Sequence, residues 1–202
     1  MMNLSPLMLH EARLEQSTQA IGVFGCTLAA RITAADLLKH GKEVATHFNV
    51  TLQLADASYV AGPSHLLIAA MHALRAFQRG TKRADVLGTE ILRFAAAQRQ
   101  ITRALSLMGI KDETRSLGGV LLGASPETLR NAYQEFLNLA GATDAPTVLE
   151  LATPAKAASI QGLFEITPTE VDATATSRRQ RDRYQAIMKL VYERCALLAT
   201  SR

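Results

Sequence analysis

The pattern of apolar and polar residues along the chain predicts short strands separated by helices. Residues 19–29 form an apolar run of β-branched and small residues without a helical period, which predicts a strand. Residues 50–54 alternate between apolar and polar side chains, as in a half-buried strand. Residues 118–124 predict a third strand, and residues 147–151 are a candidate for a fourth.

Capping residues mark where the helices of the first half begin. Thr33 opens a helix that we expect to break near Gly41 or soon after. Ser64 is the expected cap of a helix that begins with Pro63 and ends at Gly80. Helical stretches follow over residues 84–97 and 99–108, either as two helices or as one kinked helix, because no Gly or Pro separates them.

The second half has the same kind of helix signal. Ser125 and Pro126 open a helix that runs to residue 139 and is closed by Gly141. Thr167 opens another, and a long helix is predicted over residues 177–200. The elements together predict an α+β fold, with a small mixed or antiparallel sheet of three to four strands packed with six to eight helices. We expect a single domain over residues 1–202, completed by the C-terminal helix 177–200.

The amino-acid composition indicates a packed core and shows which residue types must fill it. Apolar residues are 48% of the chain and charged residues 20%, which excludes a wholly disordered chain. Aromatic residues are only 5%, so Ala, Leu, Ile and Val must fill a core of closely packed helices. Cys26 and Cys195 could form a single disulfide, but we expect two buried, reduced thiols, which favours a reducing compartment.

The sequence gives no sign of a membrane or export segment. Residues 1–15 lack a basic start and contain two glutamates, so we do not expect a secretory signal. The longest stretch without Asp, Glu, Lys or Arg, residues 57–74, contains Pro63 and two histidines and is interpreted as a buried helix with its approach. We therefore expect a cytoplasmic protein without membrane contact.

The net charge of +4 is concentrated in two segments. Residues 75–103 carry +5 and residues 178–194 carry +4, so the rest of the chain carries −5. Such focused basicity is typical of a phosphate-binding surface, although a solvated helix face gives the same pattern.

The known signatures of catalysis and metal binding are absent from the sequence. There is no nucleophile elbow, phosphate-binding loop, zinc-protease motif or paired-cysteine motif. His65 and His72 are seven residues apart, about 10 Å along a helix, which is too far for one metal ion. Glu90 lies in an apolar stretch, where a carboxylate paired with an arginine is expected. We therefore assign no catalytic residue, metal or cofactor.

The central segment, residues 53–109, resembles a known family. The matching positions are Gln53, Asp56-Ala57, Val60-Ala61-Gly62, His65-Leu66, Ala69, Ala73, Arg75-Ala76-Phe77, Gly80, Glu90-Ile91-Leu92, Arg99-Gln100-Ile101, Ala104 and Gly109. The closing LVYERCALL of residues 190–198 is similar to the family's last helix. On these residues the chain resembles the PRPK-binding protein family in its archaeal form, the small kinase-binding subunit of the KEOPS complex. It departs from the family at Phe94, where Tyr is common, and at residues 96–98, which replace a Gly-containing turn.

The resemblance implies a non-catalytic accessory subunit. The complex installs threonylcarbamoyl on the adenosine next to the anticodon of tRNAs. The subunit would bind the small atypical kinase of the complex and recruit tRNA through its single-stranded CCA 3′ end.

We choose the candidate RNA-binding residues because the resemblance implies tRNA binding and because their helical spacing places basic side chains together. Arginines four residues apart share a helix face and suit phosphate oxygens. The predicted RNA-binding residues are His65, Arg75, Arg79, Lys82, Arg83, Arg99 and Arg103. The backbone N–H groups of residues 62–65, at a helix start, are a further candidate phosphate site.

Leu190 and Leu197 form a second apolar stripe on the last helix and are the predicted kinase-binding residues. The alternative is that residues 145–176 cover this stripe.

Two other functions of the protein remain open. One is a small transferase with a scattered site such as His65, Glu90 and Arg99, and the other is a helical scaffold without RNA binding.

Overall fold

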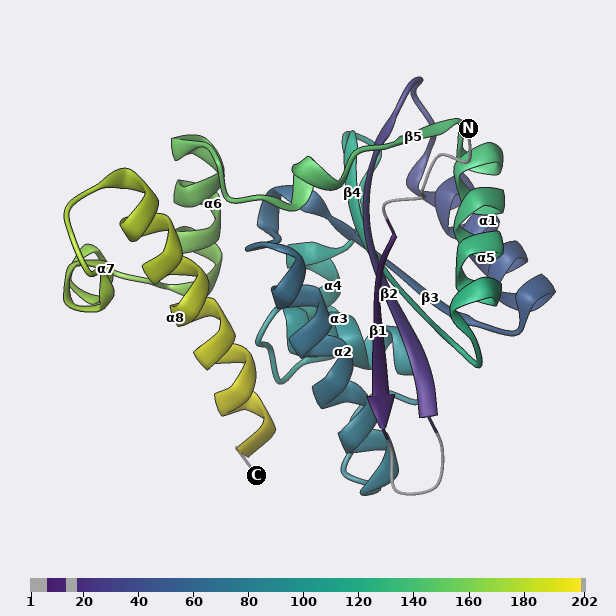
Figure 1. Cartoon of the computed structure of the whole chain (residues 1–202), viewed down its shortest axis with the longest axis horizontal. Helices are drawn as coiled ribbons and strands as arrows, with labels where there is room; N and C mark the ends of the chain where they lie inside the picture. Colours follow the sequence, from purple (N-terminus) through teal and green to yellow (C-terminus); the bar gives the residue numbers. More distant parts are fainter. Residues whose placement is uncertain (1–6, 14–17, 201–202) are drawn as a thin grey trace. The chain divides into compact units, whose positions relative to one another are not determined.

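The computed structural model describes residues 7–13 and 18–200 (Figure 1). The chain folds into two compact units, each built from two separate stretches of sequence. Unit 1 contains residues 1–57 and 110–148, and unit 2 contains residues 58–109 and 149–202. The expectation that they form a single domain stays a prediction.

Unit 1 is a five-stranded antiparallel sheet with two helices. The strand order is β1-β2-β4-β3, and β5 pairs with the end of β2. The strands are β1 (Met8–Arg13), β2 (Thr18–Leu28), β3 (Thr51–Asp56), β4 (Ser116–Gly123) and β5 (Ala142–Asp144). Helices α1 (Ala34–Phe48) and α5 (Pro126–Ala140) pack on each other and on the sheet (Figure 1).

Phe24 is the centre of the core of unit 1. Its ring lies 4.6 Å from the ring of Tyr133 and 6.0 Å from that of Phe136, between centroids. On the facing strand β4, a Cβ added to Gly119 would lie 2.1 Å from Cζ of Phe24. Glycine is therefore required at this position, because any side chain would displace the ring from a close-packed core.

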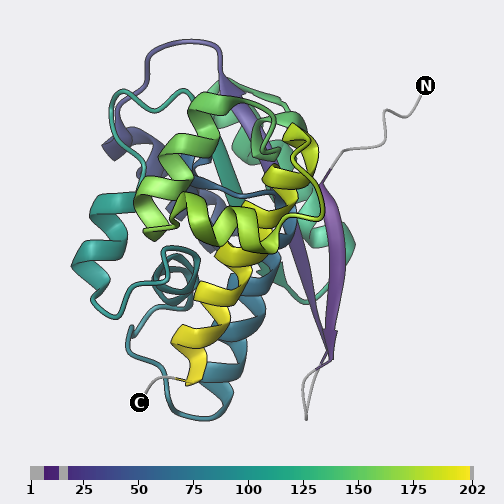
Figure 2. The same ribbon diagram turned by 90° about the vertical axis from the view of Figure 1, so that its left-hand side faces the viewer.

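Unit 2 is helical. Helix α2 (Pro63–Gln78) packs against α3 (Leu87–Ala95) and α8 (Gln180–Thr200), and α3 also contacts α4 (Ile101–Met108). Helices α6 (Pro154–Phe164) and α7 (Pro168–Thr174) pack on α8. Figure 2 shows α8 running beside α2, so the last helix of the chain lies against the first helix of the unit.

Three of the predicted caps are confirmed by hydrogen bonds. The hydroxyl of Thr33 accepts from the N–H of Asp36 at 3.1 Å. Ser125 accepts from Thr128 at 3.2 Å, and Gly141 closes that helix in the left-handed region with φ 58°. Thr167 and Glu170 bond reciprocally in a capping box.

Two helix predictions are corrected, and one alternative left open by the sequence is decided. Helix α1 does not break near Gly41, because Gly41 is buried against Leu52 and the helix continues to Phe48. Ser64 makes no capping bond; the cap position is Gly62, whose φ of 90° favours glycine. The two-helix alternative for residues 84–97 and 99–108 is confirmed, since Ala97 separates α3 from α4 with φ 50°.

The sheet has one more strand than the upper expectation. The three predicted strands of residues 19–29, 50–54 and 118–124 are confirmed as antiparallel neighbours. The fourth candidate, residues 147–151, is wrong, because Pro146–Leu149 forms a 3₁₀ turn with Leu149 buried. The structure instead adds β1 and the three-residue β5, and α6 was also not predicted. The described residues contain eight α-helices, the upper limit of the prediction.

Candidate functional site: an arginine-lined pocket in unit 2

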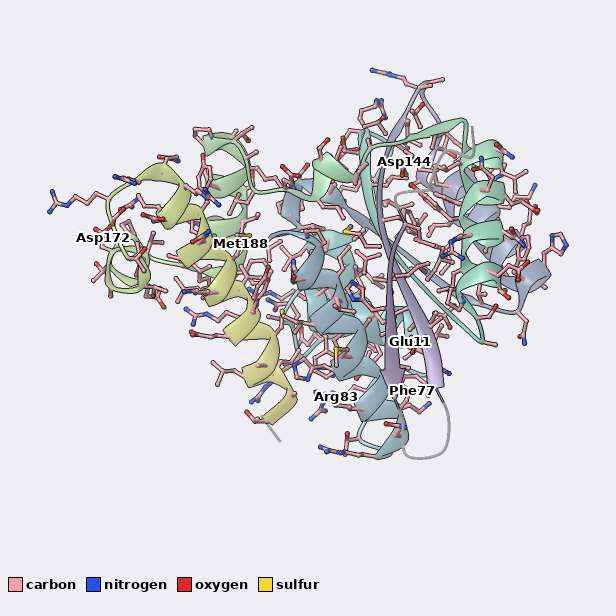
Figure 3. The ribbon with its side chains drawn as sticks, viewed as in Figure 1. Glu11, Phe77, Arg83, Asp144, Asp172 and Met188 are labelled. Carbon is pink, nitrogen blue, oxygen red and sulfur yellow. The ribbon has the colours of Figure 1, made fainter. Side chains whose placement is uncertain are left out.

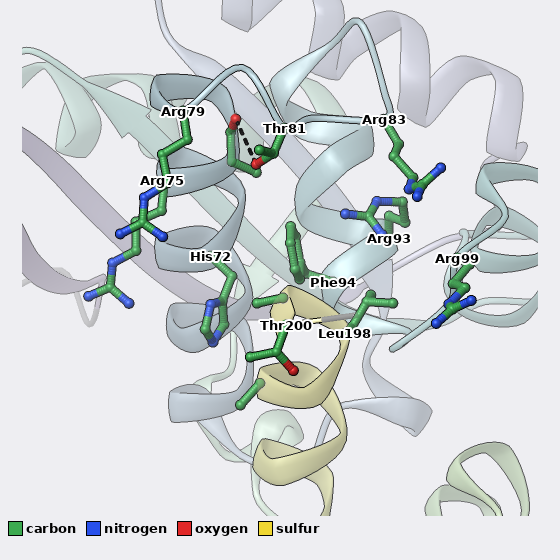
Figure 4. Close-up of a pocket in the computed structure, with 13 residues that line it drawn as sticks. His72, Arg75, Arg79, Thr81, Arg83, Arg93, Phe94, Arg99, Leu198 and Thr200 are labelled. Carbon is green, nitrogen blue, oxygen red and sulfur yellow. Dashed lines mark hydrogen bonds between the residues drawn. The ribbon is translucent and has the colours of Figure 1, made fainter. Parts of the chain in front are cut away.

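Unit 2 contains a pocket of about 610 Å³ between α2, the loop after it, α3 and the last turn of α8 (Figure 4). We call it the arginine pocket. Its walls are formed by His72, Arg75, Ala76, Arg79, Thr81, Arg83, Arg93, Phe94, Arg99, Ala196, Leu198, Ala199 and Thr200. Five of these residues are arginines and none is acidic, so the pocket is suited to an anion.

The end of α2 shapes the first wall. Arg75 and Arg79 are one turn apart and expose their side chains on the same side of the helix (Figure 4). The N–H of Thr81 donates to the carbonyl of Ala76 at 2.9 Å, and Gly80 takes φ 64°. This turn directs the following loop back along the pocket, which brings Arg83 to the opposite wall.

Glu90 fixes that opposite wall from within the core. Its carboxylate is fully buried and accepts from Nε and Nη2 of Arg93 at 2.9 and 2.6 Å. It also accepts from the backbone N–H of Ala84 at 3.0 Å and of Arg83 at 3.4 Å. Burial raises the pKa of Glu90, but these hydrogen bonds outweigh it and the pKa falls below its ordinary value of 4.5. The expected pairing of this carboxylate with an arginine is confirmed, and it ties the arginine-bearing loop to α3.

Aromatic rings form a flat part of the wall. The ring of His72 stacks on that of Phe94, with centroids 5.5 Å apart and planes 25° apart. The guanidinium carbon of Arg93 lies 4.4 Å from the centroid of the same Phe94 ring. Burial, and then the charge of Arg75, lowers the pKa of His72, so the imidazole is neutral at pH 7. The wall is therefore flat and uncharged on the His72 side.

Four of the seven predicted RNA-binding residues meet in this pocket, namely Arg75, Arg79, Arg83 and Arg99. Lys82 and Arg103 are exposed but do not line it. The Lys82 ammonium lies 3.5 Å from Asp85 and 4.8 Å from the ring centroid of Phe77, and Arg103 lies 3.8 Å from Glu165. Sequence reasoning missed His72, Arg93, Phe94 and the end of α8. The three-residue spacing of Glu90 and Arg93 was the one visible signal for Arg93.

The prediction that His65 contacts RNA is wrong. The ring is fully buried and its two nitrogens bond to backbone groups. Nδ1 accepts from the N–H of Ala61 at 3.1 Å, and Nε2 donates to the carbonyl of Ala95 at 2.8 Å. Burial lowers the pKa of His65 to about 4, so it is neutral at pH 7. His65 is a core residue that joins the start of α2 to the end of α3.

The start of α2 is also a poor phosphate site. The N–H of Gly62 donates to the carbonyl of Leu149 at 3.0 Å, and that of His65 to the carbonyl of Gly62 at 3.1 Å. The N–H of Ala61, just before the helix, is taken by His65. Most of the donors that the sequence offered for a phosphate are therefore already used.

The two predicted kinase-binding leucines have different environments. Leu190 is only 6% exposed, whereas Leu197 is 59% exposed. Helices α6 and α7, from the segment that the sequence left as a covering alternative, pack on α8. Leu190 thus belongs to the core of unit 2, and only Leu197 is available to a partner.

The described residues were also searched for metal ligands, reactive thiols and membrane-spanning helices. Residues 7–13 and 18–200 contain no group of three or more His, Cys, Asp and Glu side chains placed to hold a metal ion. Burial raises the pKa of both Cys26 and Cys195 to about 12, so both stay as thiols. Among these same residues, no helix is long and apolar enough to cross a membrane.

Residues 30–199 match the model of a protein family described as Kinase binding protein CGI-121. The chain belongs to this family. A search of the curated proteins finds no match. The matched range includes every residue of the arginine pocket except Thr200, and it includes Leu197. The resemblance to a kinase-binding family is confirmed. The exposed Leu197 of α8 lies between Ala196 and Leu198, which line the pocket.

Proposed function

We propose that this chain is a non-catalytic accessory subunit of the KEOPS complex, of archaeal type and cytoplasmic, that binds the small atypical kinase of that complex and recruits tRNA through its single-stranded CCA end. The family supports the kinase partner. The observation that supports RNA is the arginine pocket, with four exposed arginines in its walls besides Arg93, which pairs with the buried Glu90.

The geometry of the pocket suits a single-stranded end. The guanidinium groups of Arg75 and Arg79 lie on one side and those of Arg83 and Arg99 on another, as Figure 4 shows. Phosphates of successive nucleotides would bind these groups. A base would stack beside His72 and Phe94, which requires it to be unpaired.

The transferase alternative loses its candidate site. Of its three residues, His65 and Glu90 are fully buried and hydrogen-bonded within unit 2, while Arg99 is exposed in the pocket. The scaffold alternative predicts an apolar patch without a basic one, and the arginine pocket favours RNA over it.

Charge reversal in the pocket tests the proposal. Arg79→Glu with Arg83→Glu removes two phosphate partners and adds two negative charges. We expect the affinity for a five-nucleotide RNA ending in CCA to fall about a hundredfold or more at low salt, because each charge-assisted hydrogen bond contributes about 1.5–3 kcal/mol. Fluorescence anisotropy of the labelled RNA measures this change.

The matched control is Lys39→Glu with Lys42→Glu, two exposed positions on α1 of unit 1. It changes the net charge by the same amount and should leave most of the affinity. Equal affinity of the pocket variant and the wild type would remove the RNA part of the proposed function. The kinase part is measured separately.

A further inference from the structure

A second group of arginines lies at the other end of α8. Arg178, Arg179 and Arg181 are all exposed at the start of the helix, and we call them the arginine cluster. Helix α8 has 21 residues, about 30 Å at 1.5 Å per residue. Figure 3 shows the two ends of unit 2, with Asp172 near the start of α8 and Arg83 near its end. The cluster and the arginine pocket are therefore separated by most of the helix.

The cluster differs from its basic neighbours in having no counter-charge. Arg183 pairs with Asp172, and Arg194 pairs with Glu170. Asp182, the nearest carboxylate in the chain, accepts from the hydroxyl of Ser177. Among the residues that the structure describes, none of the three cluster arginines forms an ion pair.

The arginine cluster does not stabilise the helix by its position. The N-terminal end of a helix carries a partial positive charge, so acidic residues stabilise it and cations destabilise it. Arg181 lies in the first turn of α8, and Arg178 and Arg179 directly precede the helix, so their positive charges do not stabilise it. Their charge is available to an external anion.

One exposed side of α8 connects the cluster to the pocket. Arg181, Gln185 and Lys189 follow each other at one-turn spacing and are exposed. By helical geometry, Lys189 lies within about 20° of Ala196 and Thr200, both of which line the pocket. Glu193 is the carboxylate on this side, so positive charge predominates along the path.

We infer that the arginine cluster is a second phosphate-binding surface for the same RNA, whose end occupies the pocket and whose backbone continues along α8. The inference rests on the proposed function. Arg181 and Thr200 are 19 residues apart, about 29 Å along the axis. At about 3.4 Å per stacked nucleotide, roughly eight nucleotides separate the two sites. At this spacing a five-nucleotide RNA in the pocket spans about 17 Å and stops short of the cluster, whereas a whole tRNA extends past it.

The experiment compares two RNAs with two variants of the full chain. The cluster variant is Arg178→Gln, Arg179→Gln, Arg181→Gln. The control, Lys39→Gln, Lys42→Gln, Arg130→Gln, removes three exposed charges from unit 1. Each protein is titrated with the five-nucleotide CCA-ended RNA and with whole tRNA over a range of salt concentrations.

We expect the cluster variant to bind tRNA at least tenfold more weakly at low salt and to bind the short RNA as the wild type does. The slope of log affinity against log salt for tRNA should decrease in magnitude by about two to three, since each lost phosphate contact changes it by about 0.7–0.9. The melting temperature should be unchanged or higher, because the helix loses unfavourable cations.

Other results overturn the inference in separable ways. If the wild type does not bind the short RNA, the proposed function fails, and this inference fails with it. If the wild type binds both RNAs and the cluster variant binds tRNA as tightly as the control does, only the inference fails. Loss of kinase binding with tRNA affinity retained would assign the cluster to a protein interface instead. An equal loss for both RNAs would show that the cluster acts on the pocket and not on a distant part of the RNA.

Discussion

Glu90 is the residue on which the geometry of the arginine pocket depends most. It holds the guanidinium of Arg93 and two backbone N–H groups of the loop that carries Arg83. Glu90→Ala would leave the buried Arg93 without its partner, and breaking a buried ion pair in this way costs about 3–5 kcal/mol. We expect a loss of that size in the free energy of unfolding, measured by urea denaturation.

The control for Glu90 is Asp85→Ala, which breaks the exposed pair with Lys82. Exposed pairs contribute about 0–1 kcal/mol, so this variant should be nearly as stable as the wild type. Full stability of Glu90→Ala together with a loss of RNA binding would contradict the structural role and indicate that the carboxylate acts on the ligand directly.

At the scale of the element, α8 contains the buried Leu190 and the exposed Leu197. Leu190→Arg places a charge in a buried position, so we expect unit 2 to lose at least the 2–5 kcal/mol typical of truncating a core leucine. Leu197→Arg changes an exposed side chain and should leave the melting temperature within a few degrees of the wild type. The same Leu197→Arg variant is expected to bind the kinase at least tenfold more weakly in a calorimetric titration.

Leu139→Arg is the matched substitution outside α8, at a leucine of α5 that is 40% exposed. It should bind the kinase as the wild type does. Should Leu197→Arg bind the kinase normally while remaining folded, the interface lies elsewhere, with the Ala-rich helices within residues 66–105 as the next surface to test.

At the scale of the whole molecule, stability should fall in mild acid. His65 has a pKa of about 4 in the folded state against 6.5 in the unfolded chain, so the unfolded state binds more protons between these values. Stability from this group is full above pH 6.5 and decreases as the pH falls toward 4. Glu90, whose folded pKa is below 4.5, adds a further loss below that pH.

Urea denaturation at pH 7.5, 6, 5 and 4 measures this dependence, with His65→Gln as the comparison because it removes the titrating ring. The variant should be less stable than the wild type at pH 7.5. Its free energy of unfolding should change less than that of the wild type between pH 6.5 and 4.5. A wild-type free energy of unfolding that stays constant from pH 7.5 to 5 would show that His65 is not desolvated in solution.

Local features of the sequence were sufficient for most elements of the fold. The caps at Thr33, Ser125 and Thr167 act within four residues of the helix start, so their residue types alone predict where the helices begin. The i, i+4 spacing likewise places Arg75 and Arg79 on one face before any packing is known. Family membership also follows from the sequence, since it depends on the order of residue types.

The tertiary structure decided which of these residues are accessible and which meet. The periodicity of α8 could not distinguish Leu190 from Leu197, because burial of a stripe depends on the other helices of unit 2 that pack on α8, namely α2, α3, α6 and α7. Strand β5 has only three residues and exists through its pairing with β2, a contact between distant segments. The arginine pocket also depends on contacts between distant segments. Arg79, Arg93 and Thr200 come together only when α2, α3 and α8 pack, because the spacing of residues within one helix does not indicate which helix lies beside it.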